Sequence, residues 1–189
     1  MYEDKDSWIY EIYTRDYIKK ELKTDKSLEP YIIFVCDVDE IPKKELYINI
    51  KDYYNFLHEG AHIEMLFLNY GFKWKKNNSL WIHPFVITDI GTKTLSFNDV
   101  RLTKKKHIFN NSGWHVSYCF TINDIIRKFE SFAHTEYNLD KYKNKEYLLK
   151  CIKDGKNILN EDEQFILTQE YELLDDYKDF QEKIDNFYN

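Results

Sequence analysis

The most constraining feature of this sequence is an apolar run that ends in a cluster of acids. Residues 30–42 read PYIIFVCDVDEIP, with a proline at each end. The run from Tyr31 to Cys36 is short and rich in β-branched and aromatic side chains, which predicts a buried β-strand. Asp37, Asp39 and Glu40 follow it directly. In open α/β sheets ligands bind at the carboxyl ends of the strands, so these acids are candidates for a binding site.

The spacing of the two aspartates indicates a metal site. Asp37 and Asp39 point to the same side of an extended chain, because side chains alternate with a period of two. Two carboxylates on one face at the end of a buried strand must be solvated, paired or bound to a cation. Their hard oxygen atoms suit Mn²⁺ or Mg²⁺. A polar turn is the simpler alternative, but three acids within four positions favour the metal.

The composition limits the class of protein. The chain has 189 residues, 43% hydrophobic and 17% aromatic, which suits one domain with a sizeable core. Its net charge of -6 does not indicate a nucleic-acid partner. Mean hydropathy is -0.66, and neither a membrane segment nor a signal peptide is visible. Three widely spaced cysteines argue against a disulfide framework. We therefore expect a single domain over residues 1–189 in a reducing, cytoplasmic compartment.

Apolar periodicity predicts a mixture of helices and strands. Helices are expected at residues 8–22, 46–60 and 122–133 and over most of 139–189. Strands are expected at residues 31–36, 63–70, 80–87, 95–102 and 113–118. The segment 89–94 is predicted to be a turn. Two lysine clusters are predicted to lie in solvated surface loops, with contact to an anionic ligand as the alternative: Lys73, Lys75 and Lys76, and Lys104, Lys105 and Lys106. No internal repeat or glycine-rich linker interrupts the pattern.

Further candidate side chains lie downstream. His115 and Ser117 share one face of the strand at 113–118, where His115 contacts a ligand or makes a structural hydrogen bond. Trp114 lies on the opposite face, as a core residue or a sugar platform. His134 and Glu136 follow a helix end. They form either a metal ligand with a general base, or a cation at the helix C-terminus with an exposed acid.

One arginine and one cysteine complete the inventory. Arg101 neutralises a phosphate or takes part in an ordinary ion pair. Cys36 lies inside the apolar run and is not expected to act as a nucleophile. The sequence contains no Walker A loop, GxGxxG, HExxH, paired CxxC or GxSxG motif.

Four segments carry a resemblance to a known family. They read DSWIYEIYTRDYI, VCDVDEIP, SGWHVSY and IIRKFESFAHTEYN. Together they resemble glycosyltransferase family 17, over about residues 8–138, and residues 139–189 form a helical C-terminal part. The best-known members of the family transfer N-acetylglucosamine from UDP-GlcNAc to the core mannose of N-glycans.

The resemblance implies a GT-A-like α/β fold and an inverting, metal-dependent transfer of N-acetylglucosamine from a UDP-sugar, UDP-GlcNAc, to a mannosyl or other glycan acceptor. Asp37 and Asp39 would hold Mn²⁺ or Mg²⁺ against the donor diphosphate. His115 or His134 would complete the metal shell. Arg101 would contact the donor phosphates.

The resemblance leaves two residues as candidates for the general base. Glu136 is the first and Glu40 the second. Trp114 would line the acceptor pocket, and His115 and Ser117 are further candidates for substrate binding.

The N-terminus departs from the family pattern. GT-A folds begin with a β/α nucleotide-binding section, whereas only Met1 to Val35 precede the acids here. We therefore expect a fragment, or a partner chain that supplies the missing strands, with an exposed sheet edge or apolar patch. The Golgi location of animal members does not carry over. A non-catalytic glycan-binding or partner protein and a metal-dependent phosphoester hydrolase are the alternative functions.

Overall fold

Helices and strands alternate along the chain in the computed structural model, so the predicted α/β class is confirmed. The structure describes residues 5–22, 30–103, 107–131, 135–169, 172–173 and 177–188. It divides into two compact units. Unit 1 contains Phe67–Ser79 and Val116–Asn189, and unit 2 contains Trp8–Leu66 and Leu80–His115. The assignment of the whole chain to one domain stays a prediction.

Unit 2 is built on a four-stranded sheet with the order β1-β6-β3-β7. The strands are β1 (Ile32–Val35), β3 (Ala61–Ile63), β6 (Phe85–Thr88) and β7 (Ile108–Phe109). β6 is antiparallel to both β1 and β3, whereas β7 is parallel to β3. The apolar run before the acids is therefore a strand, as the sequence predicts.

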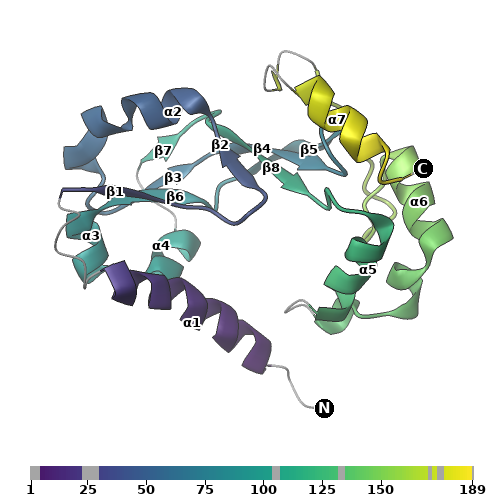
Figure 1. Cartoon of the computed structure of the whole chain (residues 1–189), viewed down its shortest axis with the longest axis horizontal. Coiled ribbons are helices and arrows are strands. Elements are labelled where there is room, and N and C mark those ends of the chain that lie inside the picture. The colour runs from purple at the N-terminus through teal and green to yellow at the C-terminus, as the bar shows by residue number, and fades with distance from the viewer. Residues whose placement is uncertain are drawn as a thin grey trace. The chain divides into compact units, whose positions relative to one another are not determined.

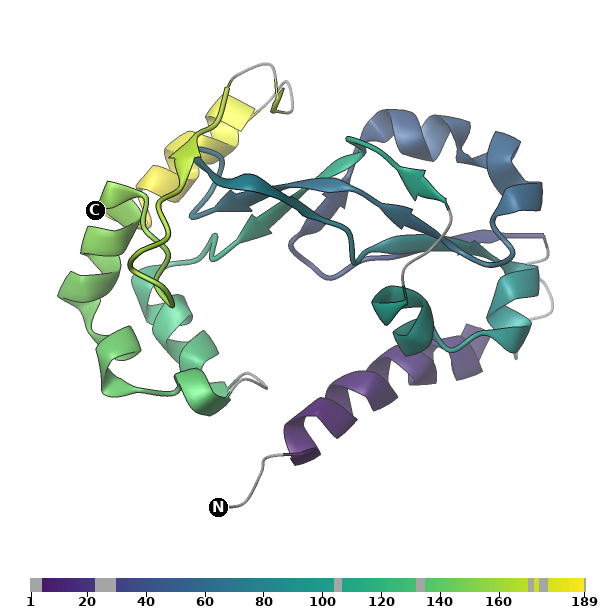
Figure 2. The same ribbon diagram turned by 180° about the vertical axis from the view of Figure 1, so that it is seen from behind.

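Helices lie on both faces of this sheet (Figures 1 and 2). One face carries α2 (Lys44–Asn49) and the 3₁₀ helix η2 (Ile50–Phe56). The other face carries α3 (Asp89–Thr94) and α4 (Phe97–Leu102), with α1 (Lys5–Leu22) beside them. The sheet is thus the middle layer of unit 2.

The central strand β6 contributes to two apolar clusters. Val86 packs in the cluster that contains Leu46 of α2. Phe85 and Ile87 pack in the cluster that contains Phe97 of α4. This division follows from the alternation of side chains along a strand. Burial on both faces explains why β6 is apolar at every position before Thr88.

Helix α1 is attached to unit 2 through polar side chains. Asp16 accepts hydrogen bonds from Ser96 Oγ (3.0 Å) and from the backbone nitrogen of Phe97 (2.7 Å). The predicted helix is confirmed, but much of its apolar surface is exposed rather than buried. The exposed apolar side chains are Ile9, Tyr10, Ile12, Tyr13, Tyr17 and Ile18.

Two of the predictions for unit 2 are wrong because a capping signal was missed. Residues 89–94 and 95–102 were expected to form a turn and a strand, but they form α3 and α4. Ser96 Oγ accepts a hydrogen bond from the backbone nitrogen of Asp99 (3.2 Å). A serine three residues before an acid is a helix N-cap pattern, and here it outweighs apolar alternation.

Two predicted strands are divided in the structure. The segment 63–70 separates at Glu64 into β3 and β4 (Met65–Asn69), and 80–87 separates near Pro84 into the end of β5 (Trp74–Trp81) and β6. The lysines near position 75 were expected in a loop but belong to β5. They pair with acids there, Lys75 with Glu172 at 2.5 Å and Lys76 with Glu163 at 2.9 Å.

A second sheet has the strand order β2-β8-β4-β5-β9. Here β2 (Glu40–Pro42) is antiparallel to β8 (Gly113–Ser117), and β9 (Ile166–Leu167) is antiparallel to β5. β8 confirms the strand predicted at residues 113–118. Because Glu40 lies opposite His115 in this register, the acids end beside a histidine that the sequence already marked.

Unit 1 has a core formed mainly by helices. The helices are α5 (Ile122–Ser131), η3 (Thr135–Tyr137), η4 (Asp140–Lys143), α6 (Lys145–Asp154) and α7 (Tyr177–Asp185). The helix predicted at residues 122–133 is confirmed as α5, and Thr121 caps its start, since the backbone nitrogen of Asp124 donates to Thr121 Oγ1 (3.2 Å). Buried core residues include Ile125, Phe129 and Leu148.

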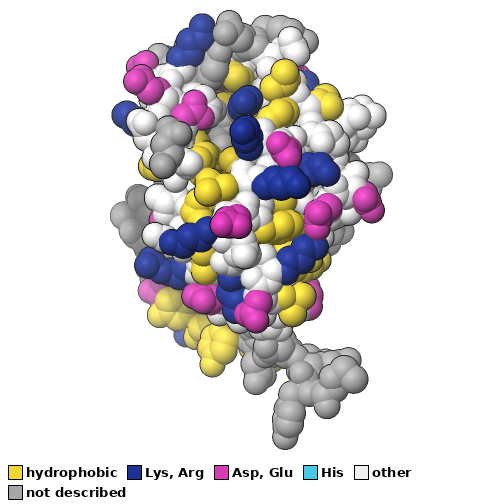
Figure 3. Space-filling view, turned by 90° about the vertical axis from the view of Figure 1, so that its right-hand side faces the viewer, with side chains coloured by type: hydrophobic (Ala, Val, Ile, Leu, Met, Phe, Trp, Pro, Cys, Tyr) yellow, Lys and Arg dark blue, Asp and Glu magenta, His cyan; other side chains and the backbone are white. Residues whose placement is uncertain are grey.

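The surface is mixed in character. On the face drawn in Figure 3, apolar side chains alternate with basic and acidic ones, and neither charge sign dominates. No helix in the described part of the chain is long and apolar enough to cross a membrane. Cys36, Cys119 and Cys151 are free thiols.

Replacing Gly155 with alanine should destabilise the protein. Gly155 ends α6 with φ 65°, and an added Cβ would lie 2.7 Å from the Trp74 ring. We expect the free energy of unfolding to fall by about 1–3 kcal/mol, as measured by urea denaturation. Lys150→Ala, at an exposed position of the same helix, is the control and should change it by less than about 0.5 kcal/mol. Equal stability of the two variants would contradict this account of the helix end.

Candidate functional site

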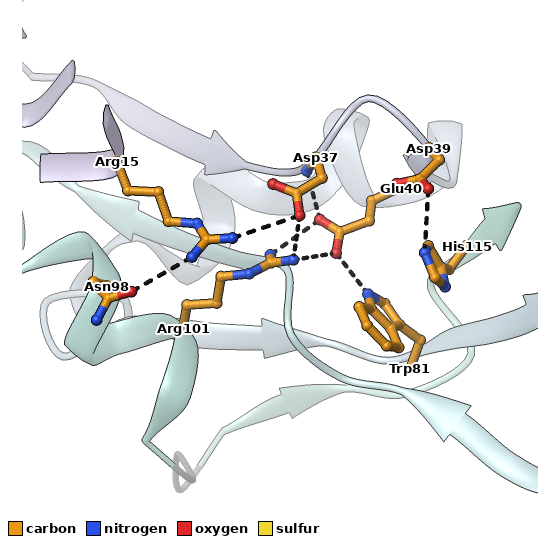
Figure 4. Close-up of polar contacts among 8 residues, drawn as sticks. All are labelled: Arg15, Asp37, Asp39, Glu40, Trp81, Asn98, Arg101 and His115. Atoms are coloured by element: carbon orange, nitrogen blue, oxygen red, sulfur yellow. Dashed lines mark hydrogen bonds and ion pairs between the residues drawn. The ribbon is translucent and has the colours of Figure 1, made fainter. Parts of the chain in front are cut away.

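The acids lie in a short turn between β1 and β2, which we call the acid loop (residues 36–40) (Figure 4). The backbone nitrogen of Glu40 donates to the Asp37 carbonyl oxygen (3.0 Å) and closes the turn. Val38 at its tip is 96% exposed, whereas Glu40 is only 4% exposed. The loop therefore projects into solvent and is anchored by its last acid.

Glu40 is held by hydrogen bonds to both of its carboxylate oxygens. Arg101 donates to Oε1 (2.7 Å) and Oε2 (3.1 Å), which is a bidentate arrangement. Trp81 Nε1 donates to Oε1 (2.6 Å), and the backbone nitrogen of Asp37 donates to Oε2 (2.6 Å). Both charged side chains are buried. Burial lowers the pKa of Arg101, but the hydrogen bonds and charge of Glu40 outweigh this and raise it.

Asp37 lies between two arginines. Arg101 Nη2 donates to its Oδ2 (2.6 Å), and Arg15 Nη2 lies 3.8 Å from the same oxygen. The pKa of Asp37 is nonetheless raised, mainly because the carboxyl is partly buried and also because Glu40 is close. Its Oδ1 makes no hydrogen bond within the part of the chain that the structure describes, so one oxygen of Asp37 is available to a ligand.

Asp39 points toward a different partner from Asp37 (Figure 4). Its Oδ2 lies 3.5 Å from His115 Nε2. His115 is buried and stacks on Trp81, with 4.1 Å between ring centroids and 16° between planes. On the other side, the His83 ring lies 4.4 Å from Trp81, and burial together with the charge of Arg101 lowers the pKa of His83.

Helices α1 and α4, which lie on the same face of the four-stranded sheet, support the acid loop through their side chains. Arg15 Nη1 donates to Asn98 Oδ1 (3.4 Å), which ties α1 to the start of α4. Asp16 of α1 accepts hydrogen bonds from Ser96 and Phe97 at the start of α4. Because Arg101 lies near the end of α4, these contacts fix the helix that presents Arg101 to the acids.

The comparison with known families decides the assignment. The family model described as Glycosyltransferase family 17 matches residues 1–185. The chain belongs to glycosyltransferase family 17. No curated protein and no solved structure matches it. The resemblance seen in four short segments therefore extends over nearly the whole chain, and the protein is a glycosyltransferase of this family.

The remaining predicted site residues of the glycosyltransferase are distributed over both units. Trp114 is 8% exposed, and the Lys43 ammonium lies 5.3 Å above its ring. Ser117 is buried at the end of β8. Glu136 is exposed in η3, which belongs to unit 1. His134 lies outside the described residues. The roles of these four residues stay predictions.

Within unit 2 the structure brings together Asp37, Asp39, Glu40, Arg101 and His115. Arg101 makes ion pairs with two of the acids, Asp37 and Glu40, as one of its two alternatives expected, and its contact with a donor phosphate stays a prediction. The thiol of Cys36 has a pKa raised by burial to about 12, which agrees with the expectation that it is not a nucleophile.

Sequence reasoning missed the aromatic and basic neighbours of the acid loop. Trp81 and His83 lie within the strand predicted at residues 80–87 and were given no role. Arg15 lies in the family segment DSWIYEIYTRDYI and was given no role, and Asn98 was placed in the strand predicted at residues 95–102. An indole, an imidazole and a guanidinium become recognisable as a site only when the fold brings them to the acids.

No group of three or more His, Cys, Asp and Glu side chains that could hold a metal occurs in residues that the structure describes. The acid loop carries the carboxylate oxygens of Asp37 and Asp39, and His115 Nε2 lies 3.5 Å from Asp39 Oδ2. Carboxylate oxygens with an imidazole nitrogen match the ligand preference of Mn²⁺.

Arg101→Gln should strongly destabilise the glycosyltransferase. Without the guanidinium, Glu40 keeps a buried charge with only two remaining donors. We expect the free energy of unfolding to fall by about 3–5 kcal/mol in chemical denaturation. Arg127→Gln is the control, because Arg127 forms an exposed ion pair with Asp124 (3.3 Å) and should cost less than about 1 kcal/mol. A similar loss of unfolding free energy in both variants would show that the buried Glu40–Arg101 pair stabilises the protein no more than an exposed ion pair does.

Proposed function

We propose that this glycosyltransferase transfers N-acetylglucosamine from UDP-GlcNAc to a mannosyl or other glycan acceptor, with inversion, at the acid loop. The observation that carries the proposal is the arrangement of that loop. The ion pair between Glu40 and Arg101 anchors the loop. Asp37 and Asp39 are the sequence neighbours of the exposed Val38. Family membership supports the reaction type. The carboxylates of the loop are suitable ligands for a divalent cation, which would bind the diphosphate of the donor.

The acid loop fits a divalent cation such as Mn²⁺ or Mg²⁺. Asp37 offers one carboxylate oxygen outside its ion pairs, and Asp39 offers an oxygen next to the imidazole of His115. His134 is a further candidate ligand from the family motif. A bound ion would supply Lewis-acid neutralisation of the leaving diphosphate.

The neighbouring side chains hold this donor set in place. Arg101 keeps the Asp37 carboxylate oriented and compensates part of its charge. Trp81 connects the anchor of the loop to His115, because it donates to Glu40 and stacks on the imidazole. Groups fixed in this way lose little entropy when a ligand binds.

The transfer also needs a base for the acceptor hydroxyl. The acceptor oxygen forms a bond to the anomeric carbon as the bond from that carbon to the UDP oxygen breaks, UDP leaves with the electron pair, and the base takes the hydroxyl proton. Glu40 has both oxygens in hydrogen bonds, which disfavours it as the base. Glu136 is an exposed carboxylate, and we assign the role to it.

The same reasoning extends to the fold. We propose that the two sheets with their helices are a GT-A-like arrangement in which the acids follow a strand of unit 2. The support is the position of the acid loop directly after β1, at the carboxyl end of that strand.

Asp39→Asn and Asp37→Asn should each abolish most of the transfer. Loss of a metal-binding carboxylate removes several kcal/mol of transition-state stabilisation, so we expect UDP release to slow by at least about 100-fold. Calorimetry should also show weaker Mn²⁺ binding in both variants. Asp162→Asn, at an exposed position of unit 1, is the control and should retain full activity. Unchanged Mn²⁺ binding and unchanged rates in both site variants would exclude the proposed role of these acids.

Glu136→Gln should remove the base while leaving donor binding intact. We expect kcat to fall by about 10²–10⁴-fold, and the acidic limb of the kcat/KM pH profile to disappear. Binding of UDP-GlcNAc with Mn²⁺ should persist in the same variant. Glu130→Gln, at an exposed position of α5, serves as the matched control. A normal rate and pH profile in Glu136→Gln would assign the base elsewhere.

A further inference from the structure

Unit 2 contains a cavity of about 580 Å³ that includes no residue of the acid loop. It lies between η2 and the segment around β7. Leu57 and Ala61 form an apolar floor, since they are 1% and 0% exposed. The size falls within the usual range of small-ligand pockets.

Aromatic rings form the walls of this cavity. Tyr53 and Phe109 meet edge to face, with 5.3 Å between ring centroids and 84° between planes. Phe56 and His107 form a second tilted pair at 6.4 Å. Phe56 is 64% exposed and Tyr53 is 44% exposed, so two aromatic side chains remain open to a ligand. Exposed rings at a cavity offer an apolar platform.

Polar groups stand among these rings. Tyr53, His107 and Asn110, whose side chains end in a hydroxyl, an imidazole and an amide, are among the residues that line the cavity. None of them makes a side-chain hydrogen bond to any part of the chain that the structure describes. They can therefore donate and accept hydrogen bonds with a ligand.

The described lining contains no Asp, Glu, Lys or Arg. A nucleotide sugar carries a diphosphate and needs cationic partners, so this lining does not suit the donor. A pyranose ring does suit it, because such a ring has an apolar C–H face for stacking and hydroxyl groups at its rim. Asn110 and Tyr53 carry an amide and a hydroxyl, which can exchange hydrogen bonds with such hydroxyls.

We infer that this cavity binds a neutral hexopyranose unit of the acceptor glycan. That the sugar belongs to the acceptor rests on the proposed function. That a sugar binds here rests on the residues that line the cavity. Phe56 provides the stacking face, while Asn110 and His107 orient the ring through its hydroxyls. The protein thus has one place for the charged donor and another for an uncharged part of the glycan.

Binding is tested on the full chain without donor or metal, so that the result does not depend on catalysis. Saturation-transfer NMR and calorimetry with mannotriose and chitotriose are the probes. We expect saturable binding of at least one trisaccharide and a loss of about fivefold in affinity for Phe56→Ala and for Tyr53→Ala. Tyr10→Ala, which removes an equally exposed ring from α1, should bind as the unchanged protein does.

The outcomes separate this inference from the proposed function. Sugar binding that is weakened by Phe56→Ala but kept in Asp39→Asn supports the cavity, even if no transfer to any acceptor is found. Absence of saturable binding by both trisaccharides would overturn it, as would equal binding in Phe56→Ala and Tyr10→Ala. Binding of an apolar peptide in place of either sugar would overturn it as well. Unchanged thermal unfolding of Phe56→Ala confirms that the comparison is made between folded proteins.

Discussion

The buried ion pair between Glu40 and Arg101 is the interaction on which the site depends. Withdrawing two charges from water costs several kcal/mol for each ion, and the cost is offset only when every polar atom finds a partner. Here the indole of Trp81 and a backbone N–H complete the shell around the carboxylate. Since the acid loop is only a few residues long, fixing Glu40 also fixes Asp37 and Asp39.

The consequence is a division of labour among three neighbouring acids. Glu40 is buried and fully hydrogen-bonded, Asp37 is half-exposed beside arginines, and Asp39 faces an imidazole. All three side chains are carboxylates, so the sequence alone does not tell their roles apart. Their roles differ because the partners come from α1, α4, β5 and β8, which are distant in sequence.

The parts of the fold that could be predicted from the sequence are those coded by local signals. The strand before the acids and the helix that follows Thr121 both depend on residues within a few positions. The segment 89–102 could not be read correctly, because two six-residue helices are too short to show a clear period. There the decisive signs were the caps, Thr88 at the start of α3 and Ser96 at the start of α4.

The candidate site shows the same limit. The acids and His115 could be named from their spacing and from family motifs. The pairing of Glu40 with Arg101 spans 61 positions and depends on a helix that was predicted as a strand. Trp81 and His83 carry no motif and acquire meaning only through ring stacking. A sequence thus supplied the reactive groups, while their partners required the fold.

The attachment of α1 has a further consequence. Its contacts to α4 and to Asp37 are made by Asp16 and Arg15, while most of its described apolar side chains are exposed and Leu22 at its end packs against the core. Attractions of this kind weaken in concentrated electrolyte, whereas packing of aliphatic groups is strengthened by many salts. Ionic strength therefore acts selectively on the first helix, and through Arg15 it reaches the charge balance around Asp37.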